Sequence, residues 1–465
     1  MRTTTRRLSI ATAAVAATAI ALTGCAAGSS AGTSTSAASA KAASGPAVDL
    51  SGVCPSTVVV QTDWNPEGEH GHLYEMLGPN PSIDASDKSV TGDLYANGKS
   101  TGVKLEIRAG GPAIGYSKVS SQMYQDKSIT LGYVSTDEAV QFSGNLPTTA
   151  VFAENDTSPM VLMWDPKTYP KVDSIKGLGK ALEKDGGVVR YFNGASYMTY
   201  LQQSGVLPKS VLDGSYDGTP SKFVAAGGKD AQQGFATAEP YIYQNQVAAW
   251  GKKVDYSLIS STGWNPYPEA MSVRSGDLQK LSPCLKKLVP VMQQADVDYL
   301  KSPGATNDLI TKLVQQYNNG WTYDSKVGAF AAAQMVKLGI AKDTDGFIGS
   351  MDEQRMSDFV KKATPVFAGS GDVKSGLTTS DLYTNEFLDK SIGLGNCSPV
   401  GRADHPTDGR RGARPAPRLP ARLPQRPSPS SRSPHARHPR RPRGAADRPR
   451  RPARRARSQH RPEDP

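Results

Sequence analysis

The sequence lacks the short motifs that mark common catalytic and phosphate-binding sites. It contains no GxSxG nucleophile turn and no GxxxxGK[ST] phosphate loop, and no cysteine stands near a histidine. The apolar run at residues 8–22 is shorter than the roughly 20 residues that a membrane-spanning helix needs. These absences disfavour an enzyme and an integral membrane protein. They favour a binding function that needs no cofactor.

The N-terminal end has the pattern of an export signal. Three arginines precede the apolar run, which ends in the sequence LTGC at residues 22–25. Leucine, a small residue, glycine and cysteine at this place resemble the lipobox of bacterial lipoproteins, in which the cysteine is acylated and becomes the first mature residue. We expect a lipid on Cys25 that anchors the protein to the outer face of the cell membrane. An ordinary signal with an incidental cysteine is the alternative, and the export route, general secretory or twin-arginine, stays open.

Residues 26–50 consist mainly of Ala, Ser, Gly and Thr. Such a segment has too little apolar surface to offset the entropy cost of ordering it. As a flexible coil it would span roughly 25 to 30 Å. We therefore predict a tether between the lipid anchor and the folded part.

The positive net charge of the chain comes from its C-terminal end. Residues 401–465 hold 19 arginines, no lysine, 5 acidic residues and 14 prolines. This segment has a net charge of +14. Because the whole chain has a net charge of +11, residues 1–400 have a net charge of −3. We predict a disordered tail over residues 397–465. Arginine-rich tails often bind nucleic acid. A composition of arginine, proline and alanine without lysine is also typical of a GC-rich reading frame translated out of phase. We favour this second explanation of the tail and expect no nucleic-acid partner.

The middle of the chain alternates short apolar runs with helical patterns, which indicates an α/β fold with parallel sheets covered by helices. The expected strands are residues 57–61, 102–108, 129–134, 160–164, 188–192, 223–225, 235–238 and 256–260. The expected helices are residues 72–77, 113–124, 137–143, 196–204 and 229–233, with long helices after residue 264. About 345 residues are more than one hydrophobic core usually serves, so we expect two lobes.

Polar and aromatic residues follow the expected strands. In an open parallel sheet, ligands bind beyond the carboxyl ends of the strands, where hydroxyls, glycines and flat rings suit a small molecule. The expected ligand contacts are Trp64, His70, Gly110, Ser135, Thr136, Asn193, Ser196, Tyr197, Glu239, Tyr241 and Trp264. Packing between lobes is the alternative for Trp64, and a salt bridge between lobes is the alternative for Glu239.

The stretch QTDWNPEGEHGHLYEM, residues 61–76, combines carboxylates, two histidines and a tryptophan. His70, His72, Glu67 and Glu69 are residue types that bind metals. The histidines do not have the i, i+4 spacing of a metal pair on a helix, and the spacing identifies no third ligand. We therefore predict no metal, and for His70 a hydrogen bond to a ligand, with a role at a helix start or at the surface as the alternative.

Several stretches together resemble a known family. DWNPEGEHGHLYEMLG resembles the opening of the thiamine-pyrimidine-precursor group of extracytoplasmic solute-binding proteins. SIKGLGK at residues 174–180 and GGKDAQQGFATAEPY at residues 227–241 resemble later landmarks of the same group. The resemblance covers residues 54–395 and extends to binders of alkylsulfonates, taurine and nitrate. The CCCFC motif of relatives that synthesise the pyrimidine is absent. The bulky His72 and the insert at residues 79–100 depart from the group's pattern, so the identity of the substrate stays open.

The resemblance implies a monomeric, two-lobed type II periplasmic binding protein that serves an ABC permease. Residues 51–164 and 261–396 would form lobe 1, and residues 165–260 would form lobe 2. The two crossings between the lobes would act as a hinge that closes on a small organic nutrient.

A thiamine pyrimidine precursor is the favoured nutrient. The first alternative is an alkylsulfonate or related anion, held by Arg108, Arg190 or Arg274. The second is a lipoprotein without a transport role, or an enzyme on this fold.

The cysteines allow one further prediction. With Cys25 lipidated, Cys54, Cys284 and Cys397 remain, and three different single bridges can be drawn. Cys54 precedes the first strand and Cys284 opens a late helix, and both would belong to lobe 1. We expect a disulfide between these two and a free Cys397.

Overall fold

The computed structural model describes residues 46–369 and 371–395. The expected signal peptide, the lipidated Cys25, Cys397 and the arginine-rich tail lie outside the described residues. Among the helices of the described part, none is long and apolar enough to cross a bilayer.

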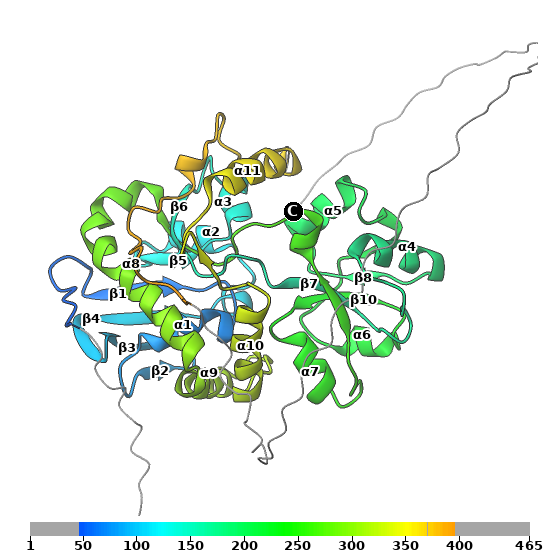
Figure 1. Cartoon of the computed structure of the whole chain (residues 1–465), viewed down its shortest axis with the longest axis horizontal. Helices are drawn as coiled ribbons and strands as arrows, with labels where there is room; N and C mark the ends of the chain where they lie inside the picture. The colour runs from blue at the N-terminus through cyan, green and yellow to red at the C-terminus, as the bar shows by residue number, and fades with distance from the viewer. Residues whose placement is uncertain (1–45, 370, 396–465) are drawn as a thin grey trace, which may run out of the picture. The chain divides into compact units, whose positions relative to one another are not determined.

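The larger sheet has seven strands in the order β2-β3-β4-β1-β5-β12-β6 (Figure 1). These are β1 (Thr57–Gln61), β2 (Ser82–Asp84), β3 (Ser89–Ala96), β4 (Lys99–Arg108), β5 (Leu131–Tyr133), β6 (Thr148–Ala153) and β12 (Ala270–Arg274). β1 runs parallel to both β4 and β5. β12 runs antiparallel to β5 and β6, and β3 runs antiparallel to β2 and β4. The apolar run of β1 is buried from Val58 onward, as is usual for a central strand covered on both faces.

The smaller sheet has five strands in the order β11-β7-β10-β8-β9. These are β7 (Met160–Trp164), β8 (Val189–Arg190), β9 (Leu212–Asp213), β10 (Ala231–Phe235) and β11 (Asp255–Leu258). β8 runs parallel to β9 and β10, and β7 runs antiparallel to β10 and β11. Most strands of each sheet run in one direction, although several neighbouring pairs are antiparallel, and helices lie beside both sheets. This arrangement confirms the expected α/β class.

The chain passes between the two sheets twice. It leaves β6 for β7 through residues 154–159, and it returns from β11 to β12 through residues 259–269. One expected boundary is wrong, because β7 was assigned to the first lobe and instead pairs with β10 and β11. An unbroken apolar run such as MVLMW is buried in either sheet, so its sequence does not reveal which sheet it joins. The division into two lobes that move about a hinge stays a prediction.

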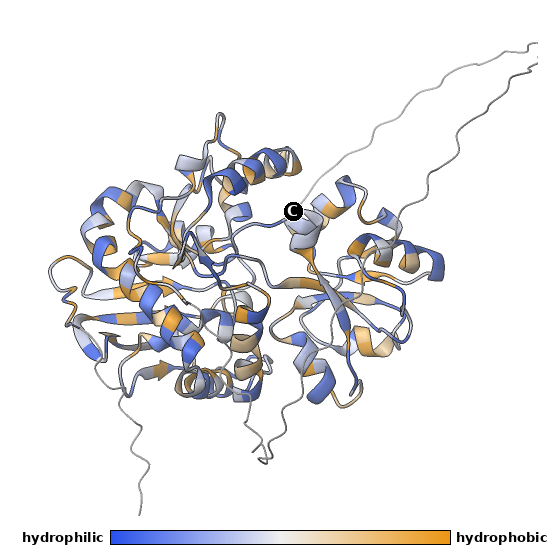
Figure 2. Ribbon diagram, in the orientation of Figure 1, coloured by the Kyte–Doolittle hydropathy of each residue, from blue (hydrophilic) through white to orange (hydrophobic). Residues whose placement is uncertain are grey.

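Eleven α-helices flank the sheets within the described residues. They are α1 (Gly71–Glu75), α2 (Val119–Gln125), α3 (Thr136–Gln141), α4 (Ile175–Asp185), α5 (Ser196–Gln203), α6 (Ser221–Ala225), α7 (Glu239–Asn245), α8 (Leu278–Lys301), α9 (Gly304–Tyr317), α10 (Ser325–Lys337) and α11 (Glu353–Phe367). The long α8 buries Leu285, Leu288, Val289 and Met292, the spacing of one helix face. Figure 2 shows the resulting mixture of hydrophobic and hydrophilic stretches along the helices.

Two neighbouring predictions are wrong in type. Phe223–Ala225, expected as a strand, belongs to α6, and residues 229–233, expected as a helix, lead into and begin β10. Gln232 and Gln233 of β10 are buried. Gln232 donates to the Tyr243 hydroxyl at 2.7 Å, and Gln233 accepts from the Tyr197 hydroxyl at 2.7 Å. A buried strand that carries hydrogen-bonded glutamines shows none of the usual apolar pattern.

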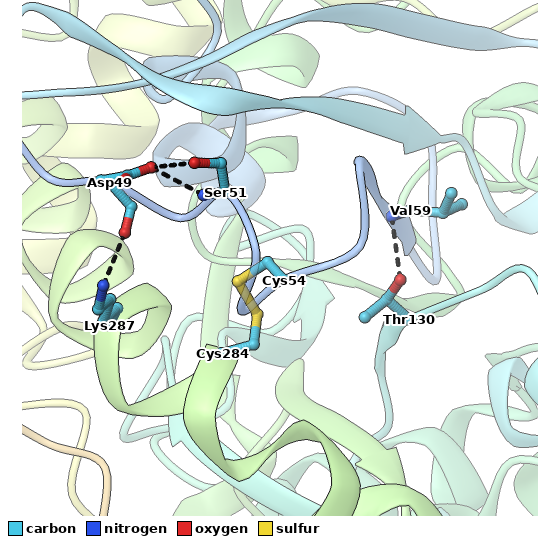
Figure 3. Close-up of a disulfide and its surroundings, with 7 residues drawn as sticks. All are labelled: Asp49, Ser51, Cys54, Val59, Thr130, Cys284 and Lys287. Atoms are coloured by element: carbon cyan, nitrogen blue, oxygen red, sulfur yellow. Dashed lines mark hydrogen bonds between the residues drawn. A yellow bond between two sulfur atoms is a disulfide. The ribbon is translucent and has the colours of Figure 1, made fainter.

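The segment before β1 is fixed to the larger sheet and to α8. The Leu50 amide donates to the Thr101 carbonyl at 2.9 Å, and the Leu50 side chain is fully buried. Lys287 Nζ donates to the Asp49 carbonyl at 3.0 Å (Figure 3). The expected tether therefore ends before Leu50, because this leucine is an apolar side chain that the sheet can bury.

A disulfide joins Cys54 to Cys284 across 230 positions of sequence (Figure 3). It connects the segment before β1 to α8, whose Cys284 is 1% exposed. This is the pairing that the positions of the two residues favoured.

Candidate ligand-binding site

Chemically active side chains gather at one edge of the larger sheet. The carboxyl ends of β1, β5 and β6 meet there with the amino end of β12, because β12 runs in the opposite direction. Asp63 follows β1, Glu154 directly follows β6, and Glu269 directly precedes β12. Residues that are far apart in sequence therefore reach one place.

Six carboxylates in and around this edge are buried, which is unusual for groups that are costly to desolvate. Their exposed fractions are 2% for Glu67, 1% for Glu69, 1% for Glu154, 7% for Glu239, 3% for Glu269 and 0% for Asp296. Among the described residues, no lysine or arginine forms an ion pair with any of them. One histidine contacts this set directly, with His72 Nδ1 2.5 Å from Glu154 Oε2. We call these six residues the acidic cluster.

Burial raises the pKa of each of the six carboxyl groups in the acidic cluster. Burial, with a smaller contribution from Glu69, raises the pKa of Glu239 to about 7. Burial and then the charges of Asp63 and Glu69 hold the pKa of Glu269 well above its usual range. Carboxyl groups in this position either keep a proton or need a cation beside them.

His70 lies in the same region and is fully buried. Its Nε2 is 3.1 Å from Asp63 Oδ1, and its ring centroid is 5.0 Å from that of Tyr133. The Tyr133 hydroxyl donates to Glu154. Burial lowers the pKa of His72 to about 3, so this second histidine is neutral. His72 therefore adds little compensating charge to the interior around it.

The smaller sheet contributes to the same region. Thr237, which follows β10, donates through Oγ1 to Glu69 Oε1. Glu239 begins α7 just beyond, and its Oε2 accepts from the Phe235 amide at 2.6 Å. A second link joins the two parts where Ser196 of α5 donates to Asp137. Carboxylates and hydroxyls from both sheets thus meet between them.

Aromatic rings from both sheets surround Trp64. Its ring centroid lies 5.8 Å from that of Phe192, which follows β8, and 6.0 Å from those of Tyr116 and Trp321. Phe192 in turn packs on Tyr216 at 4.7 Å. Rings of this kind provide flat apolar walls for a heterocycle or an organic cation. We call these five residues the aromatic group.

The expected Gly110 has a structural role beside Trp64. A Cβ atom at this position would lie 2.2 Å from the Thr62 carbonyl oxygen. At the adjacent Gly111, whose φ is 54°, a Cβ atom would lie 2.6 Å from the Trp64 ring. Both glycines permit the close approach of this turn to the chain after β1.

The remaining expected contacts, apart from the exposed Asn193, have partners within the protein. Thr136 accepts from the Tyr267 amide at 2.9 Å, and Trp264 packs in the core with its centroid 5.1 Å from that of Phe359. Ser135 donates to Asp137, Tyr197 donates to Gln233, Tyr241 packs on Phe330, and Asn193 is exposed. The structure brings His70, Trp64 and Glu239 close to the two groups described above. Ligand contact by any of the expected residues stays a prediction.

Sequence reasoning missed three members of the acidic cluster. Glu154 follows an apolar strand that was not identified, and Glu269 precedes another. Asp296 lies on the buried face of α8, where a carboxylate among apolar neighbours is a signal in itself. The local sequence contains these signals, but it does not show that the three residues converge.

The raised pKa of Glu239 predicts an inverted pH dependence of stability. The unfolded chain releases this proton near pH 4.5 and the folded chain near pH 7, so the stabilisation by the bound proton is lost as pH rises through this window. We expect this group to cost roughly 3 kcal/mol of unfolding free energy between pH 4.5 and 7. Urea denaturation of the wild type and of Glu239→Gln, at several pH values with a chelator present, measures it. Equal pH slopes for both proteins would contradict the assignment.

Comparison with known proteins gives similarity at the level of solved structures. No model of a protein family matches the sequence, and no curated protein matches it. The periplasmic aliphatic sulphonate binding protein of Escherichia coli is similar, with 14% identity, a TM-score of 0.46, and coverage of 72% of this chain and 94% of that protein. A protein of Bordetella bronchiseptica RB50 is similar at 14% identity and a TM-score of 0.45, over 72% of this chain and 96% of its own.

The periplasmic nitrate-binding protein of Synechocystis PCC 6803 is also similar, at 10% identity and a TM-score of 0.43. Its alignment covers 71% of this chain and 87% of that protein. At such identities and TM-scores, the ligand of the present chain has to be argued from its own residues.

Proposed function

We propose that this protein captures a small organic molecule that bears amino groups or positive charge, and delivers it to an ABC permease. The observation that carries the proposal is the acidic cluster, to which both sheets contribute and in which no lysine or arginine is paired among the described residues. Buried carboxylates attract a cation or a donor of hydrogen bonds, because such a ligand restores the interactions lost with water.

The positions of the arginines argue against an anion. Arg108 pairs with Glu106 and Asp126, and Arg190 pairs with Asp213 and Asp230. Arg274 is 8% exposed and binds Asp277 and three backbone carbonyls. The three arginines that would hold a sulfonate are therefore already occupied by the protein. This makes the alkylsulfonate alternative the weaker one.

The aromatic group favours a flat ring as the ligand's body. Stacking on Trp64 and Phe192 combined with hydrogen bonds to carboxylates suits an aminopyrimidine, whose amino group is a donor and whose ring nitrogen becomes a donor once protonated. A thiamine pyrimidine precursor, the nutrient implied by the DWNPEGEHGHLYEMLG stretch, meets these requirements. We propose it as the first substrate to test.

Capture would require movement of the two sheets relative to each other. The acidic cluster is buried, so a ligand reaches it only after contacts such as Thr237 to Glu69 and Ser196 to Asp137 have opened. The two crossings, at residues 154–159 and 259–269, would then serve as the hinge. A ligand that contacts both sides stabilises the closed form, because it binds that form more tightly. The lipid on Cys25 would hold this device at the outer face of the membrane.

Tryptophan fluorescence tests the proposal at neutral pH. Aminopyrimidines should give a saturable change in wild-type emission, with half saturation at micromolar concentration or below, since the ring stacks beside Trp64. The variant Trp64→Phe should lose this change. The matched control Trp250→Phe should keep it, because Trp250 packs on Phe223 in a hydrophobic cluster that contains no member of the aromatic group. A response to alkylsulfonates and none to aminopyrimidines would contradict the proposal.

A further inference from the structure

We propose that Asp63, His70 and Glu269 form a binding site for one divalent transition-metal ion, of which Zn²⁺ is the first to test. One ligand atom from each of the three residues can be chosen so that all lie within 4.8 Å of one another. Metal bonds of about 2.0 to 2.2 Å place ligand atoms roughly 3 to 4 Å apart. The three side chains therefore need only a small adjustment to bind one ion.

The donor set matches borderline metals. Imidazole nitrogen and carboxylate oxygen are both ligand types of Zn²⁺ and Fe²⁺, and three protein ligands leave further positions for water or substrate. Calcium and magnesium prefer sites built from oxygen alone. The histidine therefore sets the class of metal.

The surroundings of these residues also fit a cation. His70 is fully buried and Glu269 is 3% exposed, so the ion would be held in a region of low dielectric. Glu69 Oε2 is a buried carboxylate oxygen with no hydrogen-bond partner among the described residues. This unpartnered oxygen is a second, independent sign that the place lacks a positive group.

A purely structural role explains only part of the arrangement. The 3.1 Å contact between Asp63 and His70 is an ordinary hydrogen bond by itself. It does not explain why the Glu269 carboxylate is buried beside the pair. Asn155 donates to Glu269 Oε2, which fixes the orientation of this carboxylate in the way that outer partners orient metal ligands.

The inference goes beyond the proposed function, since it needs no organic ligand. Full-length protein, freed of metal with a chelator and exchanged into buffer at pH 7.5, is titrated with Zn²⁺ in equilibrium dialysis, and bound metal is counted by mass spectrometry. The wild type should hold one more equivalent than Glu269→Gln at Zn²⁺ concentrations of a few micromolar, and affinity for this equivalent should fall at least tenfold in the variant. The four histidines at positions 405, 435, 438 and 460 are the same in both proteins, so any zinc that they bind cancels.

A second variant protects the test against misfolding. The Asp63 side chain is 41% exposed, so Asp63→Asn should fold as the wild type does and still lose the equivalent. The control Glu183→Gln changes an exposed carboxylate that accepts from Ser210, and it should bind zinc as the wild type does. Zn²⁺ should raise the melting temperature of wild type and control but not of either site variant. Equal stoichiometry and equal melting shifts in all four proteins would overturn the inference, whatever the outcome of the fluorescence titrations.

Discussion

Replacement of Cys54 and Cys284 together by alanine will lower the free energy of unfolding by about 5 kcal/mol. The bridge closes a loop of 230 positions in the unfolded chain, and in the chain-entropy description such a loop lies near the upper end of what one disulfide can contribute. The bridge also fixes the segment before β1 to α8, so its loss frees the start of a central strand. The double substitution avoids a free thiol that could form a new bridge with Cys397.

Urea denaturation of the oxidised wild type and of this double variant, at pH 6 with a chelator present, measures the effect. The single variant Cys397→Ala serves as the control and should unfold as the wild type does, because the expected bridge leaves that cysteine free. A loss below 1 kcal/mol in the double variant would show that α8 and the other contacts of the segment hold it without the bridge.

The second large effect concerns ligand affinity. Glu69→Gln should weaken the binding of an aminopyrimidine about 10- to 100-fold, which corresponds to the 1.5 to 3 kcal/mol of a hydrogen bond to a charged group. Glutamine keeps an oxygen that can accept from Thr237, so the contact between the two sheets remains. Burial raises the pKa of Glu69, and glutamine removes this costly ionisable group, so the unfolding free energy above neutral pH should not fall.

Calorimetric titration with the same ligand measures this affinity, and a thermal melt checks the fold. Glu183→Gln again serves as the control, because its carboxylate is exposed on α4. Unchanged affinity in Glu69→Gln would remove this carboxylate from the site. Loss of affinity accompanied by a large loss of stability would mean that Glu69 acts on the fold and not on the ligand.

The sequence predicts the fold class well because local patterns suffice for it. TVVVQ reads as a buried strand, and the spacing of Leu285, Leu288 and Met292 reads as a helix. Local patterns fail at β10, where glutamines that bond to tyrosine hydroxyls replace the apolar residues of a buried strand. They also fail at β7, because its composition fits either sheet. In both cases long-range pairing decides the outcome.

The candidate site is predictable only in part for a related reason. His70 and Trp64 stand in one conspicuous stretch, and Glu239 belongs to a recognisable dipeptide with proline. Glu269 is 199 positions after His70, and only the antiparallel insertion of β12 beside β5 brings the two together. A metal site judged from the spacing of the two histidines alone therefore lacks its third ligand. The acidic character of the site emerges from topology, because no single segment carries it.

A comparison of two pyrimidines whose one differing substituent is a cation or an anion tests the central claim most directly. One is a pyrimidine ring with an aminomethyl substituent, and the other is the same ring with a carboxylate in its place, each titrated calorimetrically into metal-free protein at pH 7.5. If the buried carboxylates select the ligand, the aminomethyl compound should bind at least about 100-fold more tightly, a difference of about 2.7 kcal/mol. Equal binding of the two compounds, or tighter binding of the carboxylate, would contradict the account.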